Sequence, residues 1–183
     1  GFKREFDKVR FNAAVFYTDI EDLQVTLDAG SCSSRISFNV PEAHTLGVEW
    51  ELVAYPMELL MLTFSGSLLE AEFDSTVTDS NGNVLGGVED GNRLASVPEF
   101  QMAASATYTF PVNAFGSNEM YVSAMFQHVG DRYTQPSDQV AGAGNFVSGL
   151  PFGGATGAEV TAVDLELDAY EQVNLRAGIV WDT

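Results

Sequence analysis

The chain has 183 residues, 45% of them hydrophobic, and a net charge of −18 from 26 acidic and 8 basic side chains. Such a charge repels nucleic-acid phosphates and anionic membrane surfaces, which disfavours both as partners. The hydrophobic content excludes a disordered acidic tail, so the acidic residues are expected in loops or on a wetted face. Cys32 is the single cysteine, lies in a Gly-Ser-rich segment, and is interpreted as incidental.

The N-terminal third predicts strands joined by one short and one long connection. Residues 1–6 have the pattern of the tail of a strand, and residues 7–10 that of a hairpin turn. Residues 11–27 alternate between two faces, and Asp19, Glu21 and Asp22 in their second half are expected above a membrane. A polar loop is expected over about residues 28–42. The chain begins without Met and in mid-pattern, which predicts a piece of something longer.

The clearest alternation lies in residues 44–55. Every second residue from Leu46 to Ala54 is apolar, while Glu49 and Glu51 point to the opposite face. This apolar face is nine residues long, whereas strands of soluble domains average about 5–6 residues and membrane strands need about 9–11. The pattern therefore favours a barrel strand with lipid on one side and water on the other.

The remaining strands repeat this pattern, and the connections alternate in length. Strands are predicted at residues 60–68, 100–110, 120–127 and 173–181. Short or moderate connections (7–10, 56–59, 111–118) alternate with long ones (28–42, 77–97, 136–164). Outer-membrane barrels have short periplasmic turns and long external loops. The predicted fold class is all-β, an antiparallel up-and-down meander of about seven long strands forming part of a transmembrane β-barrel.

Five segments, taken in order, resemble the C-terminal part of the barrel of TonB-dependent outer-membrane receptors. They are Asn12–Gln24, Asn39–Glu51, Gly91–Phe100, Val129–Gln135 and Tyr170–Gly178. The resemblance implies a bacterial outer-membrane protein that imports a scarce, bulky ligand such as an iron–siderophore complex, cobalamin or a glycan. It also implies a barrel of about 22 strands filled by an N-terminal plug, contact with outer-membrane lipid, and energy from the TonB complex.

Within that family, residues 1–183 are expected to form a single-domain, C-terminal fragment of the barrel that lacks the plug. TonB would be contacted through the missing N-terminal region. The polar candidates for a solute path are Glu49, Glu51, Gln101, Gln172, Asn174 and Arg176. The alternative is that these are solvent-exposed residues of the barrel wall, whose polar groups form hydrogen bonds with water, with the plug or with one another. The external loops are expected to contribute to ligand capture.

Other motifs point away from catalysis, cofactors and metals. The segment 79–83 followed by Asp90 has some features of a calcium loop, but Val84 stands where the tight turn requires glycine, which favours an Asn-Gly turn. His44 and His128 are the only histidines, and Glu42 is the one carboxylate at same-face spacing, too few ligands for a metal. No catalytic motif is present, so no enzyme is predicted.

Two other fold classes remain open at this stage. A soluble β-sandwich binding module would also have about seven strands, and it predicts two buried faces that meet each other. A small complete barrel is disfavoured by the odd number of strands. Aromatic residues near the strand ends are expected to anchor the sheet at the membrane interfaces: Phe11, Tyr17, Trp50, Phe100, Tyr108, Phe110 and Trp181.

Overall fold

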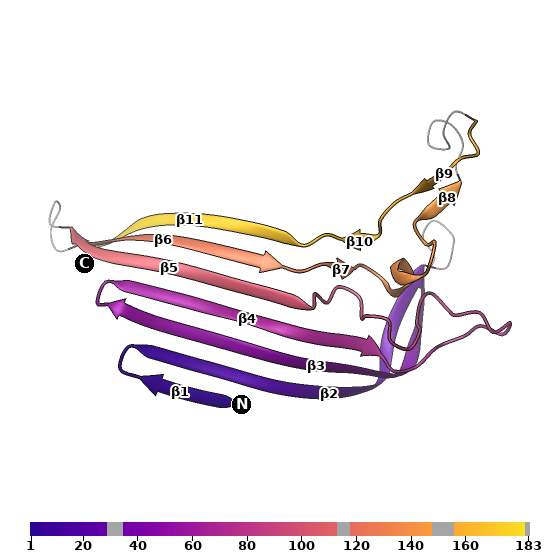
Figure 1. Cartoon of the computed structure of the whole chain (residues 1–183), viewed down its shortest axis with the longest axis horizontal. Coiled ribbons are helices and arrows are strands. Elements are labelled where there is room, and N and C mark those ends of the chain that lie inside the picture. Colours follow the sequence, from indigo (N-terminus) through magenta and orange to yellow (C-terminus); the bar gives the residue numbers. More distant parts are fainter. Residues whose placement is uncertain (29–34, 113–117, 148–155, 182–183) are drawn as a thin grey trace.

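A computed structural model describes residues 1–28, 35–112, 118–147 and 156–181 as a single antiparallel sheet with irregular segments at one end (Figure 1). Its seven strands pair in the order of the chain: β1 (Phe2–Phe6), β2 (Val9–Asp28), β3 (Arg35–Met57), β4 (Leu60–Phe73), β5 (Phe100–Val112), β6 (Asn118–Val129) and β11 (Tyr170–Trp181). The predicted all-β meander is confirmed. Because the strands form one sheet rather than two packed sheets, the sandwich alternative is wrong. Among the described residues β1 and β11 are unpaired edges, so these residues do not close a small barrel.

The register places the alternating residues of neighbouring strands on common faces. Val48 of β3 lies opposite Val15 of β2 and Leu68 of β4, while Glu51 lies opposite Asn12 and Ser65. We call the face with Val48 the apolar face and the face with Glu51 the polar face. Large side chains of the apolar face remain open, with Val15 69% exposed and Leu175 81% exposed. An apolar surface of this extent marks contact with a partner or a membrane.

Three aromatic side chains each cover a glycine on the adjacent strand. The ring of Phe16 lies over Gly47, and a Cβ added to Gly66 would lie 2.5 Å from the ring of Trp50. Tyr121 covers Gly178 in the same way, with its ring 2.7 Å from an added Cβ. A glycine therefore leaves room for each ring. Trp50 also packs against Phe64 at 6.3 Å, so it stabilises the middle of the sheet rather than one of its ends.

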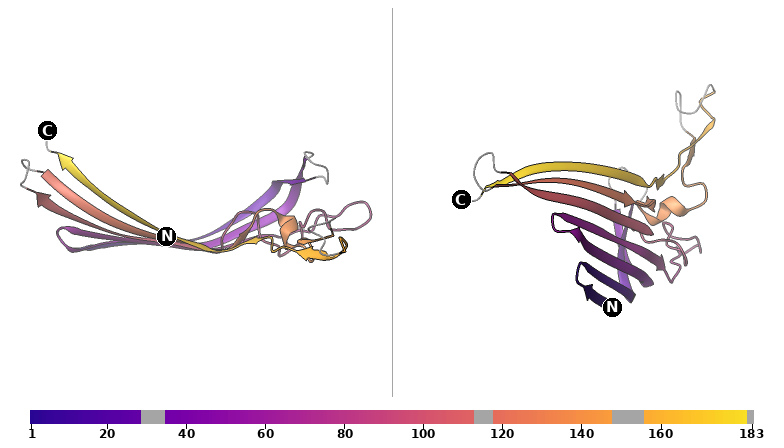
Figure 2. Two further views of the ribbon diagram at one scale, coloured as in Figure 1. Left: turned by 90° about the horizontal axis from the view of Figure 1, so that it is seen from above. Right: turned by 60° about the vertical axis from the view of Figure 1, so that its left-hand side comes forward.

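The β2–β3 hairpin extends beyond its neighbours and bends near its distal end (Figure 2). The expectation of a polar loop over residues 28–42 is wrong, because β3 begins at Arg35. Pairing is continuous except between Asp22 and Pro41, where proline has no N–H to donate and Asp22 has a φ of 55°. Cys32 lies outside the described residues.

The other connections agree with the predicted sidedness. Asp7 and Lys8 form the β1–β2 turn, shorter than the predicted 7–10, because Val9 and Arg10 already pair with β1. The β4–β5 and β6–β11 connections lie at the opposite end, on the same side as the end of β2 and the start of β3 (Figure 1). The β6–β11 connection has more structure than its sequence suggests: β7 (Arg132–Tyr133) pairs with β10 (Glu166–Leu167), β8 (Asn145–Val147) pairs with β9 (Val160–Ala162), and a 3-10 helix η1 spans Pro136–Gln139.

A small hydrophobic core stabilises the end of the sheet at which the β4–β5 and β6–β11 connections lie, which we call the long-connection end. Val40, Ala43, Phe73 and Val88 are at most 1% exposed and form one cluster. Ala43 and Phe73 pair across β3 and β4 on the polar face, four residues beyond Gly47 and Leu69. Val88 belongs to the connection 77–97, which the sequence predicted only as a long connection. That connection therefore folds over the distal end of the polar face.

Candidate functional site

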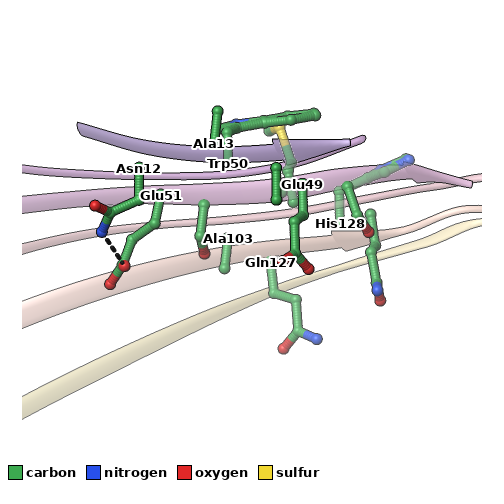
Figure 3. Close-up of a pocket in the computed structure, with 14 residues that line it drawn as sticks. Asn12, Ala13, Glu49, Trp50, Glu51, Ala103, Gln127 and His128 are labelled. Atoms are coloured by element: carbon green, nitrogen blue, oxygen red, sulfur yellow. Dashed lines mark hydrogen bonds between the residues drawn. The ribbon is translucent and has the colours of Figure 1, made fainter. Parts of the chain in front are cut away.

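A hollow of about 560 Å³ lies on the polar face and crosses β2 to β6 (Figure 3). Asn12, Glu49, Glu51 and Gln127 point to this side of the sheet, while Ala13 and Trp50 point to the other. Asn12 Nδ2 donates a hydrogen bond of 3.0 Å to Glu51 Oε2. The remaining polar lining includes Ser65, Ser67 and Gln101.

The structure places all six polar candidates on this face, although only half of them line the hollow. Glu49, Glu51 and Gln101 do so. On β11, Gln172 lies directly opposite Gln127 of β6, while Asn174 and Arg176 lie further along the strand, opposite Met125 and Ser123. Sequence reasoning missed Asn12, Ser65, Ser67 and Gln127 as lining residues. Their alternation with apolar residues was the signal that could have identified them.

Chemically, the hollow presents carboxylates, amides and hydroxyls rather than a reactive group. Neither lysine nor arginine is among its lining residues, so Glu49 and Glu51 make it a negatively charged surface. Two pairs of hydroxyls continue the polar face along the strands, Thr63 with Ser105 at 2.7 Å and Thr107 with Ser123 at 2.9 Å. Such a surface can exchange hydrogen bonds with water or with a polar solute.

Arg93 ties the long connections to one another. Its Nη1 lies 2.8 Å from Asp131 Oδ2, and its Nε lies 3.2 Å from Glu99 Oε1. The guanidinium also lies 3.7 Å from Glu166 Oε1 and 5.6 Å from the centre of the Tyr133 ring. Arg93 therefore joins the β4–β5 connection to the start of β5, the β6–β7 junction and β10.

The ion pairs of Arg93 shift the pKa values of the groups around it. Partial burial lowers the pKa of Arg93, but the hydrogen bond to Asp131 and the charges of Glu99 and Glu166 outweigh it, so the pKa is raised. The Arg93 hydrogen bond lowers the pKa of the Asp131 carboxyl. Glu166 shares a hydrogen bond with Asp131, which raises the pKa of Glu166. Burial raises the pKa of Tyr133.

The backbone of Arg93 also forms hydrogen bonds, to the side chain of Gln139. Its N–H donates to Gln139 Oε1 at 2.9 Å, and its carbonyl accepts from Gln139 Nε2 at 2.8 Å. The Ser96 N–H donates to the Tyr133 carbonyl at 2.7 Å. This network was not predictable from the sequence, because its residues come from four separate segments. Arg93 was nevertheless a rare basic residue in an acidic region.

His44 forms a second polar cluster at the same end of the sheet. Its Nδ1 lies 2.7 Å from Asp74 Oδ1, its Nε2 lies 3.4 Å from Glu70 Oε1, and its ring stacks on Tyr17 at 5.7 Å. The hydrogen bond to Asp74 raises the pKa of His44, with Glu70 acting in the same direction. The sequence identified only Glu42 as a partner, because cross-strand neighbours cannot be read from spacing along one strand.

The segment 79–83 folds as the predicted turn. Asp79 Oδ1 accepts hydrogen bonds from the N–H groups of Asn81 and Asn83, and Gly82 has a φ of 85°. The hydrogen bonds from Asn83 and Asn81 lower the pKa of Asp79. Across the described residues, no group of three or more His, Cys, Asp or Glu side chains is arranged to hold a metal ion. Within the same ranges, no helix has the length and apolar character needed to traverse a bilayer.

The sheet has long antiparallel strands, one open apolar face, one polar face and its long connections at one end. These features define a segment of a transmembrane barrel wall. The family described as TonB dependent receptor-like, beta-barrel, matches residues 1–182. The chain belongs to this family of outer-membrane transporters and is part of such a receptor's barrel. It is therefore not an enzyme. No protein among those with curated descriptions matches it.

Solved structures agree on the fold. The ferric yersiniabactin uptake receptor FyuA from Yersinia pestis matches with a TM-score of 0.60 at 19% identity, over 98% of this chain and 21% of its own. The ferric preacinetobactin receptor BauA from Acinetobacter baumannii has a TM-score of 0.59 at 16% identity, over 96% of this chain and 21% of its own. The siderophore receptor PiuA from Acinetobacter baumannii has a TM-score of 0.56 at 16% identity, over 96% and 20%. The chain spans about a fifth of the length of these receptors.

Proposed function

We propose that residues 1–183 form a C-terminal portion of the barrel of an outer-membrane receptor for energy-coupled uptake of a bulky nutrient. The candidate ligands are a ferric siderophore, cobalamin or a glycan. Ferric siderophores come first among these because the three similar receptors described above are a ferric yersiniabactin uptake receptor, a ferric preacinetobactin receptor and a siderophore receptor. In this arrangement the apolar face contacts lipid, and Glu49, Glu51, Gln101, Gln172, Asn174 and Arg176 face the lumen.

The observation that carries this proposal is the combination of an open apolar face with a polar hollow on the opposite face. Water on the inside and lipid on the outside explain why neither face of the sheet is covered by another layer. The long connections then lie outside the cell and the turns of β1–β2 and β3–β4 in the periplasm. The N-terminal region of the full-length receptor would supply the plug and the contact with TonB.

The packed long-connection end favours a role in ligand capture. Loops that a rigid scaffold positions are where binding residues collect. Here the connection 77–97 is anchored by Val88 in the core and by Arg93 in the ion-pair network. The β6–β11 connection is attached to it through Gln139.

Removing the β6–β11 connection tests this role. In the full-length receptor, replacing residues 136–164 by a short Gly-Ser linker is expected to weaken uptake while the barrel still inserts. A narrower deletion of residues 144–162 keeps Gln139 and its bonds to Arg93, and so separates lost ligand contacts from lost loop packing. Loss of one strong contact region corresponds to about tenfold weaker apparent affinity.

Uptake is measured with radiolabelled ferric siderophores, cobalamin and a maltooligosaccharide, each offered separately to cells with and without the TonB complex. The probe that the full-length receptor imports only when TonB is present identifies the ligand class. Insertion is checked by heat-modifiable mobility of the barrel in outer-membrane fractions. Unchanged uptake in both deletions would refute the capture role, and uptake without TonB would refute energy coupling.

A further inference from the structure

Although the net charge of the chain is −18, the β1–β2 hairpin is basic, and its turn lies at the end of the sheet that has the short turns. Residues 1–10 contain four of the eight basic residues, Lys3, Arg4, Lys8 and Arg10, and only two acidic ones, Glu5 and Asp7. The general expectation that the chain repels anionic surfaces therefore does not hold for this hairpin.

Arg4 lies on the apolar face, among aromatic rings. It is directly opposite Phe11 in the β1–β2 register, and Phe2 and Phe6 flank it on the same face of β1. The guanidinium lies 5.5 Å from the centre of the Phe6 ring, and the rings of Phe2 and Phe11 are 6.2 Å apart. Phe2 and Phe6 are 57% and 58% exposed, so this surface is open.

No carboxylate in the described part of the chain forms an ion pair with Arg4. Arg10, its counterpart on the polar face, has Glu5 at 3.1 Å. Arg4 is also three residues from the turn residue Asp7, about 10 Å along the strand and about 7 Å along the membrane normal at a 45° tilt. A long cationic side chain at that depth extends toward the headgroup region and takes an anionic partner there.

We propose that Arg4, with Phe2, Phe6 and Phe11 around it, forms a binding site for an anionic phospholipid of the periplasmic leaflet. The guanidinium binds the headgroup phosphate, and the rings pack against the first methylenes of the acyl chains. A zwitterionic headgroup binds less tightly, because its own ammonium neutralises the phosphate. The periplasmic placement rests on the orientation given in the proposed function.

Native mass spectrometry of the full-length receptor in detergent micelles tests the site. The wild type is expected to bind dioleoyl-phosphatidylglycerol about fivefold more tightly than dioleoyl-phosphatidylethanolamine, the effect of one cation near a headgroup. Arg4→Gln should remove this preference, and Arg4→Lys should retain most of it. Arg10→Gln is the matched control and should leave it intact. A wild type without preference, or an Arg4→Gln variant that keeps it, would overturn the site.

A separate experiment tests the orientation. Lys8→Cys, in a receptor whose Cys32 is replaced by serine, should react with a membrane-impermeant maleimide only after the outer membrane is permeabilised. Labelling in intact cells would overturn the periplasmic placement and the proposed orientation. The preference measured in micelles does not depend on orientation, so the two failures are distinguishable.

Discussion

Replacing Arg93 with glutamine is expected to loosen the long-connection end of the sheet while leaving its strands folded. The substitution leaves Asp131, Glu99 and Glu166 close together with no cation between them. Breaking a buried ion pair costs about 3–5 kcal/mol, and about 2 kcal/mol is expected here because the carboxylates are partly exposed. That cost corresponds to about 30-fold more frequent local opening.

Hydrogen exchange of the full-length receptor measures this opening. Peptides that cover residues 85–97 and 131–139 should exchange faster in Arg93→Gln, while those from the β5–β6 hairpin should not change. Arg132→Gln is the matched control, because Arg132 contacts the Tyr170 ring at 5.7 Å and forms none of the ion pairs of Arg93. Arg93→Lys should lie between the two, since lysine keeps the charge but not the planar fork. Equal protection in Arg93→Gln and the wild type would show that the network does not hold this end.

Replacing Gly66 with alanine is expected to destabilise the sheet itself. An added Cβ would lie 2.5 Å from the Trp50 ring and 2.9 Å from the backbone carbonyl oxygen of Gln101. The ring can shift, but the carbonyl belongs to the neighbouring strand. Overpacking of this kind costs about 1–3 kcal/mol.

Urea unfolding of the full-length receptor in lipid vesicles measures that cost. Trp50→Leu removes one of the two clashes, so the double variant with Gly66→Ala should lose less stability than the two single changes predict together. Ser65→Ala, on the opposite face of the same strand, is the control and should have a small effect. Strict additivity of Trp50→Leu and Gly66→Ala would contradict the packing of the ring over the glycine.

The strands and their faces were predictable because a period of two is a local property of the sequence. Leu46, Val48 and Leu52 define the apolar face of β3 without knowledge of any neighbour, and Glu49 and Glu51 define the other. Once strands pair in chain order, the register carries these faces across the sheet. The six polar candidates consequently share a face in the structure.

The long-connection end was not predictable, because its stability comes from contacts between distant segments. Residues 35–42 look polar enough for a loop, yet Phe38 and Val40 pair with Val25 and Leu23 and contribute to a core. That core also needs Val88, about 50 residues away. The one available signal was local: apolar residues occupy every second position at 23, 25 and 27 and again at 36, 38 and 40. Arg93 and His44 acquire their partners only across strands and connections.

Site-directed spin labelling of β3 tests most directly whether this sheet is a membrane wall with lipid on one face and an aqueous lumen on the other. Nitroxides are placed singly at Val48, Glu49, Glu51 and Leu52 of the full-length receptor in lipid vesicles. Labels at Val48 and Leu52 should collide preferentially with oxygen, because oxygen concentrates in lipid. Labels at Glu49 and Glu51 should collide much less with oxygen and more with a water-soluble nickel complex. Labels at Val48 and Leu52 that meet the nickel complex more than oxygen, or neither reagent, would contradict the account.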